Sequence, residues 1–219
     1  MVKYQEGEAC MYLSPTQLFE RYLEDWPALE AVNDILWEVY ETIKDSYALG
    51  NKLLLCGNGG SAADCEHIVG ELMKGFLLKR PVPPEFAKNS ALAGEGAKLQ
   101  GALPAISLTG HSALSTAYAN DVNPDMVFAQ QVYGYGRQGD VLLGLSTSGN
   151  AKNVCHAIRV AHAVGMKTIG ITGKGGGVMK ELCSLCICLP ATETYRIQEL
   201  TLPVYHALCA MLEAAFFSQ

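Results

Sequence analysis

His67 and Glu71 lie four residues apart in the segment CGNGGSAADCEHIVGELMKGF (56–76). On a helix this spacing places both side chains on one face. A single pair of this kind is most often an exposed contact or a satisfied core histidine. Here, however, the glycine-rich run GNGGS (57–61) directly precedes the helix, and free amide groups at a helix N-terminus attract anions. His67 and Glu71 are therefore candidates for an acid/base pair or for metal ligands.

A second loop with anion-binding chemistry is STSGN (146–150). Ser146, Thr147 and Ser148 can each donate a hydrogen bond to a phosphate oxygen, beside the amides of the following helix. Neither loop has the Walker or Rossmann glycine pattern, and either one alone could be an ordinary strand-to-helix turn. Two such loops at strand ends of one sheet favour a sugar phosphate or a similar anion.

The last helical segment, YRIQELTLPVYHALCAMLEAAFF (195–217), carries Gln198, Glu199 and His206 in apolar surroundings. Taken alone, His206 is more simply a core histidine. On a continuous helix Gln198 and His206 are separated by about 12 Å of rise. Both could bind one ion only at full stretch, so a second subunit or a later helix start would be needed.

The elements that must position these residues alternate along the chain. Five short apolar runs predict buried strands: 52–56, 105–109, 141–146, 167–172 and 185–190. The helices expected between them include 61–74, 126–136, 151–164 and 196–217. This alternation predicts an α/β fold with a doubly wound, five-stranded parallel sheet. In such sheets ligands bind at the carboxyl ends of the strands, where both glycine-containing loops would lie.

The remaining segments frame this core. We expect a single domain over residues 1–219, with an α/β core over 51–219. Two N-terminal helices within residues 1–50, the first capped by Ser14, suggest an arm that packs in an oligomer. The Ala-, Gly- and Pro-rich stretch 82–103 offers no clear element. It is equally readable as a lid over a site or as a plain insertion.

Composition excludes several classes of function. The formal net charge of −6 disfavours direct nucleic-acid binding. The N-terminus does not have the pattern of a signal peptide, and no apolar run reaches the length of a membrane span, so we expect a cytoplasmic protein. The eight cysteines are scattered and suit a reducing compartment. In CSLCICL (183–189) a buried strand is favoured over a metal cluster, with Cys186 and Cys188 on one face and Cys183 pointing away.

Four segments together resemble the sugar isomerase (SIS) domain family: CGNGGSAADCEHIVGEL, GDVLLGLSTSGNAKNV, GMKTIGITGKGGG and YRIQELTLPVYH. Within that family they look most like the sedoheptulose 7-phosphate isomerases, also called phosphoheptose isomerases. The resemblance covers nearly the whole chain after the first few residues, except for 82–103. It implies a flavodoxin-like SIS fold and interconversion of a ketose phosphate and an aldose phosphate through an enediol.

The resemblance also assigns residues. It implies one divalent metal ion per site, usually zinc, held by His67, Glu71, Gln198 and His206, with Glu71 and His206 as the acid/base pair. Substrate contacts would come from the sugar-binding and phosphate-binding positions, which are Asn58, Gly59, Gly60, Ser61, Asp121, Ser146, Thr147, Ser148 and Gln198. It further implies a homotetramer with sites at subunit interfaces.

Some positions depart from the pattern of the isomerases. Ala151 stands where a serine often follows STSGN, and Tyr195 stands where an aspartate is usual. ELMKGF replaces a segment that often carries an arginine after its glycine. These departures leave the metal and acid/base residues intact and put the identity of the sugar phosphate in question. The alternatives are an isomerase for another sugar phosphate, a non-catalytic SIS protein that binds a replication initiator, and a sugar-phosphate-sensing regulator.

Overall fold

The computed structural model describes residues 13–218. Its centre is a five-stranded, all-parallel sheet with the strand order β2-β1-β3-β4-β5. The strands are β1 (Leu53–Cys56), β2 (Ala105–Ser107), β3 (Val141–Leu145), β4 (Lys167–Thr172) and β5 (Leu185–Cys188). All five predicted strands are therefore present, and the α/β doubly wound prediction is confirmed.

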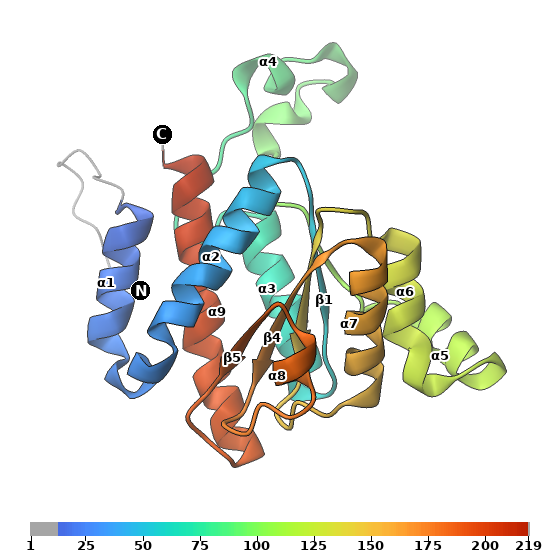
Figure 1. The fold of residues 1–219 in the computed structure, drawn as a ribbon. Coiled ribbons are helices and arrows are strands. Elements are labelled where there is room, and N and C mark those ends of the chain that lie inside the picture. Colours follow the sequence, from blue (N-terminus) through green and yellow to red (C-terminus); the bar gives the residue numbers. More distant parts are fainter. Residues whose placement is uncertain (1–12, 219) are drawn as a thin grey trace.

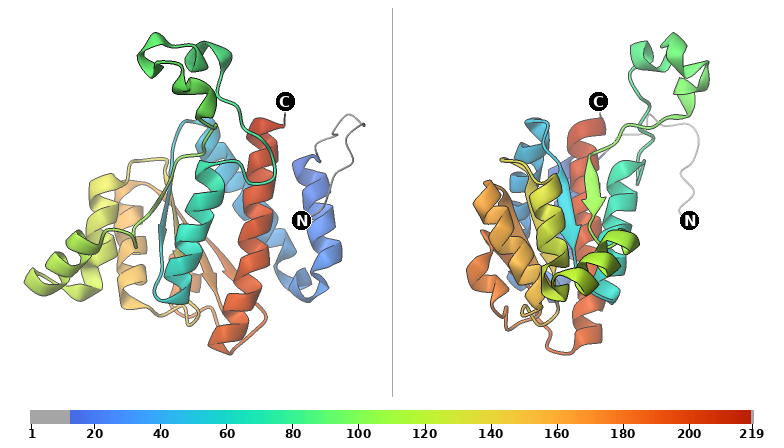
Figure 2. Two further views of the ribbon diagram at one scale, coloured as in Figure 1. Left: turned by 180° about the vertical axis from the view of Figure 1, so that it is seen from behind. Right: turned by 90° about the vertical axis from the view of Figure 1, so that its right-hand side faces the viewer.

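One face of the sheet is covered by the N-terminal helices together with α3 and α9, as Figures 1 and 2 show. These elements are α1 (Pro15–Asp25), the 3₁₀ helix η1 (Pro27–Val32), α2 (Asn33–Ala48), α3 (Gly60–Met73) and α9 (Thr194–Phe217). α1 begins with a complete capping box, in which Ser14 and Gln17 bond to each other's backbone amides. α2 contributes Leu36, Val39 and Ile43 to the core on this face. The predicted N-terminal helices thus pack within the fold, and their role in an oligomer stays a prediction.

The opposite face carries the second core, formed by side chains such as Leu142, Phe128 and Ile158. The helices here are α6 (Val127–Tyr135), α7 (Lys152–Val164) and the short α8 (Met179–Leu182). Next to α6 lie α5 (Ser112–Asp121) and η4 (Pro124–Met126). Helix α5 was not predicted from the sequence, because its residues are mostly small or polar and form no apolar stripe.

The stretch 82–103 projects from the body of the molecule (Figure 1). It contains three short helical segments, α4 (Pro84–Ala87), η2 (Ser90–Leu92) and η3 (Glu95–Lys98). The expectation of no regular element was therefore wrong in detail. In Figure 1 the stretch 82–103 lies at the amino ends of the strands, whereas the glycine-containing loops lie at the carboxyl ends. It cannot close over those loops of its own chain.

The structure corrects two further predictions, one on α9 and one on the cysteine-rich segment. α9 is long and apolar enough to span a membrane by composition alone, contrary to the sequence reading. However, 67% of its most apolar window is buried inside the fold, so it is a core helix. Residues 185–188 of CSLCICL form strand β5, whereas Cys183 precedes the strand and does not point away. A Cβ built on Gly170 would lie 3.0 Å from the Cys183 sulfur and 3.1 Å from the Cys186 sulfur.

Candidate active site

The two glycine-containing loops meet where the sheet changes winding direction. β1 pairs with β2 on one side and with β3 on the other, so the loops after β1 and β3 flank the topological switch point. Their proximity is direct, because the side-chain amides of Asn58 and Asn153 exchange two hydrogen bonds of 3.0 and 2.9 Å. The N-termini of α3 and α7 both start here without a side-chain cap. Their partial positive charges suit an anion between the loops.

The loop after β3 is held rigidly. Ser146 is buried, and its amide donates to the carbonyl of Ile171. Gly149 has a φ of +67°, and a Cβ there would lie 2.0 Å from the carbonyl oxygen of Gly176. The Asn150 side chain accepts from the Val178 amide, which ties this loop to the one after β4. Ser146, Thr147 and Ser148 are therefore presented on a fixed backbone.

In the loop after β1, Ser61 is buried and Gly59 adopts a φ of +56°. Gln198 of α9 lies directly against this loop, because a Cβ built on Gly60 would be 2.4 Å from its Nε2 atom. The structure therefore brings Gly60 and Gln198 together, and their role in substrate binding stays a prediction. Asp121 ends α5 and is exposed, with its carboxylate bonded to the neighbouring Asn120. The described residues show no hydrogen bond or ion pair from Asp121 to either loop.

His67, Glu71 and His206 come together between α3 and α9; we call them the acid/base cluster. His67 Nε2 lies 3.1 Å from Glu71 Oε1, and the imidazole rings of His67 and His206 are 5.0 Å apart, edge to face. Lys74 Nζ is 3.1 Å from the other Glu71 oxygen. The pairing of His67 and Glu71 on one helical face and the placement of His206 beside them agree with the sequence prediction.

His206 has an unusual electrostatic setting. Burial and the nearby His67 lower the pKa of His206 below that of a free histidine, and Glu71 partly opposes this shift. Its Nε2 atom is buried and has no hydrogen-bond partner among the described residues. A neutral imidazole with a free nitrogen is ready to take part in proton transfer or to bind a metal ion.

The donor types of the acid/base cluster, two imidazoles and one carboxylate, are those found in catalytic zinc sites. As it stands, no group of three or more His, Cys, Asp or Glu side chains in residues 13–218 is arranged to hold a metal ion. Glu71 is instead engaged by Lys74 and His67. Gln198 lies elsewhere, because α9 is a continuous helix from Thr194 and carries it two turns away from His206.

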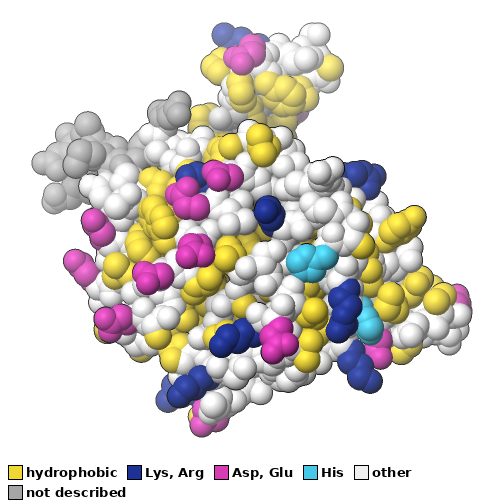
Figure 3. All heavy atoms as spheres, viewed as in Figure 1, with side chains coloured by type: hydrophobic (Ala, Val, Ile, Leu, Met, Phe, Trp, Pro, Cys, Tyr) yellow, Lys and Arg dark blue, Asp and Glu magenta, His cyan; other side chains and the backbone are white. Residues whose placement is uncertain are grey.

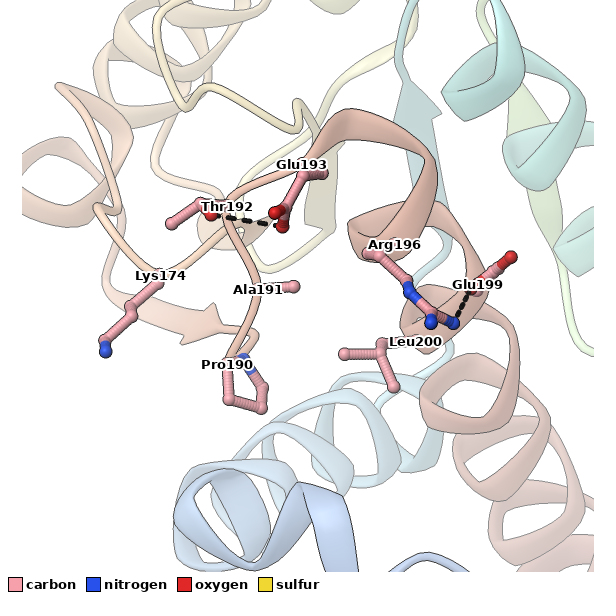
Figure 4. A pocket seen from close by; sticks show the side chains of 8 residues that line it. All are labelled: Lys174, Pro190, Ala191, Thr192, Glu193, Arg196, Glu199 and Leu200. Carbon is pink, nitrogen blue, oxygen red and sulfur yellow. Dashed lines mark hydrogen bonds and ion pairs between the residues drawn. The ribbon is translucent and has the colours of Figure 1, made fainter.

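Two cavities lie near α9. The larger, about 410 Å³, opens at the start of the helix beside Lys174 and Thr192 (Figure 4). Four charged side chains line it: Arg196 is bonded to Glu199 at 2.8 Å, and Lys174 and Glu193 are the other two. The smaller cavity, about 220 Å³, is the one that contacts His206, and it is lined by Tyr22 and Trp26 from the α1 side. Proximity to the acid/base cluster makes the smaller cavity the more relevant to chemistry.

The sequence reading missed several residues that contact the acid/base cluster. The Tyr205 hydroxyl lies 2.9 Å from His67 Nδ1 and 3.4 Å from Asp64. Lys74 pairs with Glu71. Asp64 and Lys74 lie three residues before His67 and three after Glu71, so helical spacing could have suggested both. No pattern in the sequence points to Tyr205.

The model of the SIS domain family matches residues 26–101 and 90–173. The chain belongs to the SIS domain family. This SIS domain is 41% identical over 181 residues to a phosphoheptose isomerase of Rhodospirillum rubrum, covering 83% of this chain and 86% of the relative. It is 36% identical over 194 residues to a phosphoheptose isomerase of Akkermansia muciniphila, covering 89% and 92%.

Solved structures agree. Phosphoheptose isomerase GmhA from Neisseria gonorrhoeae matches with a TM-score of 0.71 and 31% identity, over 89% of this chain and 92% of that one. A phosphoheptose isomerase from Francisella tularensis matches with a TM-score of 0.70 and 26% identity, over 90% and 95%. The SIS fold expected from the sequence motifs is thereby confirmed.

Proposed function

We propose that this SIS domain is an aldose–ketose isomerase that interconverts sedoheptulose 7-phosphate and heptose 7-phosphate. The observation that carries the proposal is the convergence of His67, Glu71 and His206 in a protein whose relatives are phosphoheptose isomerases. The paired loops at the switch point supply a place for the phosphate.

The reaction moves a hydrogen between C1 and C2 through an enediol. Glu71 is suited to remove the proton from carbon, since a carboxylate held in place by neighbours can act as a general base. His206 is suited to move a proton between the two oxygens, because an imidazole takes up and releases a proton near neutral pH. The phosphate loops hold the far end of the sugar and thereby fix the reacting end.

We further propose that the site binds zinc through His67, Glu71 and His206. The unpartnered Nε2 of His206 supports this assignment. When bound, the ion would polarise the carbonyl and stabilise the negative charge of the enediolate. Gln198 of the same chain lies with Gly60 instead, so its predicted role as a ligand would require another copy of the chain.

A homotetramer with shared sites is part of the proposal. Ser61 and Glu71 are ten residues apart on α3, which corresponds to about 15 Å of rise and to directions about 80° apart around the helix axis. A chain of eight bonds of about 1.5 Å, from C1 to phosphorus, is shorter than about 12 Å. One substrate molecule therefore fits poorly across both groups of a single chain. A neighbouring copy that supplies one of them resolves the mismatch.

The test of function is turnover of sedoheptulose 7-phosphate by the purified chain, with and without zinc, beside Glu71→Gln and His206→Ala. We expect metal-stimulated turnover in the unmodified chain and a loss of at least about 10²-fold in each variant. No turnover by a folded chain that still binds the sugar phosphate would redirect the proposal to another sugar phosphate. No binding at all would favour a protein-binding role.

The test of shared sites is subunit mixing. Glu71→Gln and Ser61→Ala chains would be inactive or weak alone. If each site takes Ser61 from one copy and Glu71 from another, co-assembled mixtures regain about a quarter of the unmodified sites. Mixtures that stay as weak as their parents would place each site within one chain.

A further inference from the structure

Residues 82–99, which we call the projection, leave the body of the molecule through a narrow and well-bonded base. At this base Pro81 and Gln100 form an isolated antiparallel bridge. The amide of Gly101 also donates to the carbonyl of Arg80 at 2.6 Å. The direction of the projection is therefore set by backbone bonds to the body rather than by a slack linker.

The projection has ordered internal packing but no cover from its own chain. Its helix α4 packs against η3, where a Cβ built on Gly96 would lie 2.3 Å from the carbonyl oxygen of Ala87. The Asn89 side chain accepts from the Ala91 amide at 2.9 Å. Across the projection, all of which the structure describes, only Gly96 is buried. Ordering these residues costs conformational entropy, and burial within their own chain does little to offset it.

The base of the projection lies next to the acid/base cluster. Arg80 donates to the carbonyl of Glu71 at 2.9 Å. The Gln100 side chain accepts from the amide of Gly75, four residues beyond Glu71, at 2.8 Å. In both views of Figure 2 the projection stands beyond the C-terminal end of α3, which is the end nearer the cluster. A partner that reaches the cluster from outside therefore has to pass the projection.

The shared site proposed above fixes how two copies face each other. It needs Ser61 of one copy beside Glu71 of another, ten residues further along α3. In a two-fold pair, the commonest arrangement of homo-oligomers, an axis parallel to α3 would set identical residues at the same height. The axis must therefore run across α3, so that the two α3 helices are antiparallel. The carboxyl-end loops of the second copy then lie level with the amino ends of the strands, where the projection stands.

We infer that the projection covers the carboxyl-end loops of a second copy of this chain and forms an outer wall of the shared site. The inference rests on the proposed function, because the shared site sets the orientation of the copies. Phe86 and Leu99 are 49% and 46% exposed, and the contact would remove their apolar surface from water. A wall at this place excludes water from the phosphate end of the sugar and strengthens the polar contacts there. It also gives a role to a segment that lies away from the loops of its own chain.

Amine cross-linking between two complementary variants tests this placement, without sugar or metal. Lys88 and Lys98 lie on the projection, whereas Lys152 and Lys174 follow β3 and β4 at the carboxyl ends. One variant combines Lys88→Arg with Lys98→Arg, and the other combines Lys152→Arg with Lys174→Arg. Neither variant alone can join the projection to a carboxyl-end loop. We expect the co-expressed pair to form this link, because the remaining lysines meet between copies.

Three results of the cross-linking would overturn the inference. One is a monomeric chain, and another is an unmodified assembly without the link. The third is a link that forms in the unmodified chain but not in the co-expressed pair, since it would then join residues of one copy. Turnover without the link would leave the isomerase in place and remove the inference. The link without turnover would do the reverse.

Phe86→Ser gives a second readout, with Tyr133→Ser as its matched control. Tyr133 is 70% exposed on α6, which covers the opposite face of the sheet. We expect Phe86→Ser to weaken the association of copies about tenfold, because the exposed half of an aromatic side chain loses its cover. Tyr133→Ser should leave association unchanged. Both are measured by sedimentation over a dilution series, and equal effects of the two substitutions would contradict the inference.

Discussion

Two polar groups lie along the contact between α3 and α9, and they differ in how completely they are bonded. The first is the pair Arg80–Glu213, whose side chains are 0% exposed and 2.6 Å apart. Glu213 also accepts from the amides of residues 76–78. Arg80 donates its remaining nitrogens to the carbonyls of Leu72 and Glu71. This pair is saturated with partners.

The second is the acid/base cluster, one to two helical turns away. His206 lies seven residues before Glu213, so the two share a face of α9. Yet His206 Nε2 has no partner among the described residues, and His67 is 43% exposed. Bonded groups stabilise a structure, whereas unsatisfied ones cost stability and remain available to a ligand. The comparison assigns a structural role to Arg80–Glu213 and a chemical role to the acid/base cluster.

The largest effect on stability is expected from Glu213→Ala. The substitution leaves the Arg80 charge buried without its partner and three amides without an acceptor. We expect the free energy of unfolding to fall by about 3–5 kcal/mol, as measured by urea denaturation. Because Arg80 also holds the carbonyl of Glu71, turnover should fall with stability.

A double variant sharpens this prediction. Arg80→Met combined with Glu213→Leu replaces the pair by apolar side chains and should recover the part of the lost stability that comes from the unpaired Arg80 charge, while the amides of residues 76–78 stay without this acceptor. A Glu213→Ala variant as stable as the unmodified chain would contradict the structural role assigned to Arg80–Glu213.

The opposite sign is expected for His206→Leu. An unpartnered buried polar atom costs about 1–3 kcal/mol, so its replacement by an apolar side chain should raise the stability of the metal-free protein by about 1 kcal/mol. Turnover should be lost. The measurement pairs urea denaturation with the isomerase assay. A destabilised His206→Leu would mean that His206 serves packing more than chemistry.

The fold could be predicted from the sequence wherever a local pattern marks an element. The strands at 141–146 and 167–172 were found because unpatterned apolar runs between helices are characteristic of buried parallel strands. The segment 82–103 was read as irregular because its short helical turns lack an apolar stripe. Its position at the amino ends of the strands follows from its place between the helix 61–74 and the strand 105–109, so the predicted alternation already argued against a lid over the carboxyl-end loops of the same chain. Figure 3 likewise shows acidic side chains over α1 and α2 and basic ones over α7, a separation that overall charge conceals.

The candidate site was predictable only where spacing fixes neighbours. His67 and Glu71 were paired by the helical repeat, and His206 was joined to them by family resemblance rather than by physics. Tyr205 was missed because its contact with His67 spans 138 residues of sequence. Gln198 was predicted to bind the same metal ion as His206, but two positions on one helix need not share one site.

The smallest effect is expected at the edge of the acid/base cluster. Lys74 pairs with Glu71 as Arg80 pairs with Glu213, but the Lys74 side chain is 59% exposed. Ion pairs in contact with solvent contribute little, so Lys74→Gln should change the free energy of unfolding by less than about 0.5 kcal/mol. Its effect on turnover should stay below about tenfold and should shrink at high salt, which screens exposed charges. Arg196→Gln, which removes a similar exposed pair with Glu199, is the control. If Lys74→Gln abolished turnover while Arg196→Gln did not, Lys74 would belong to the acid/base cluster despite its exposure. Exposure would then not separate residues with a chemical role from those without one.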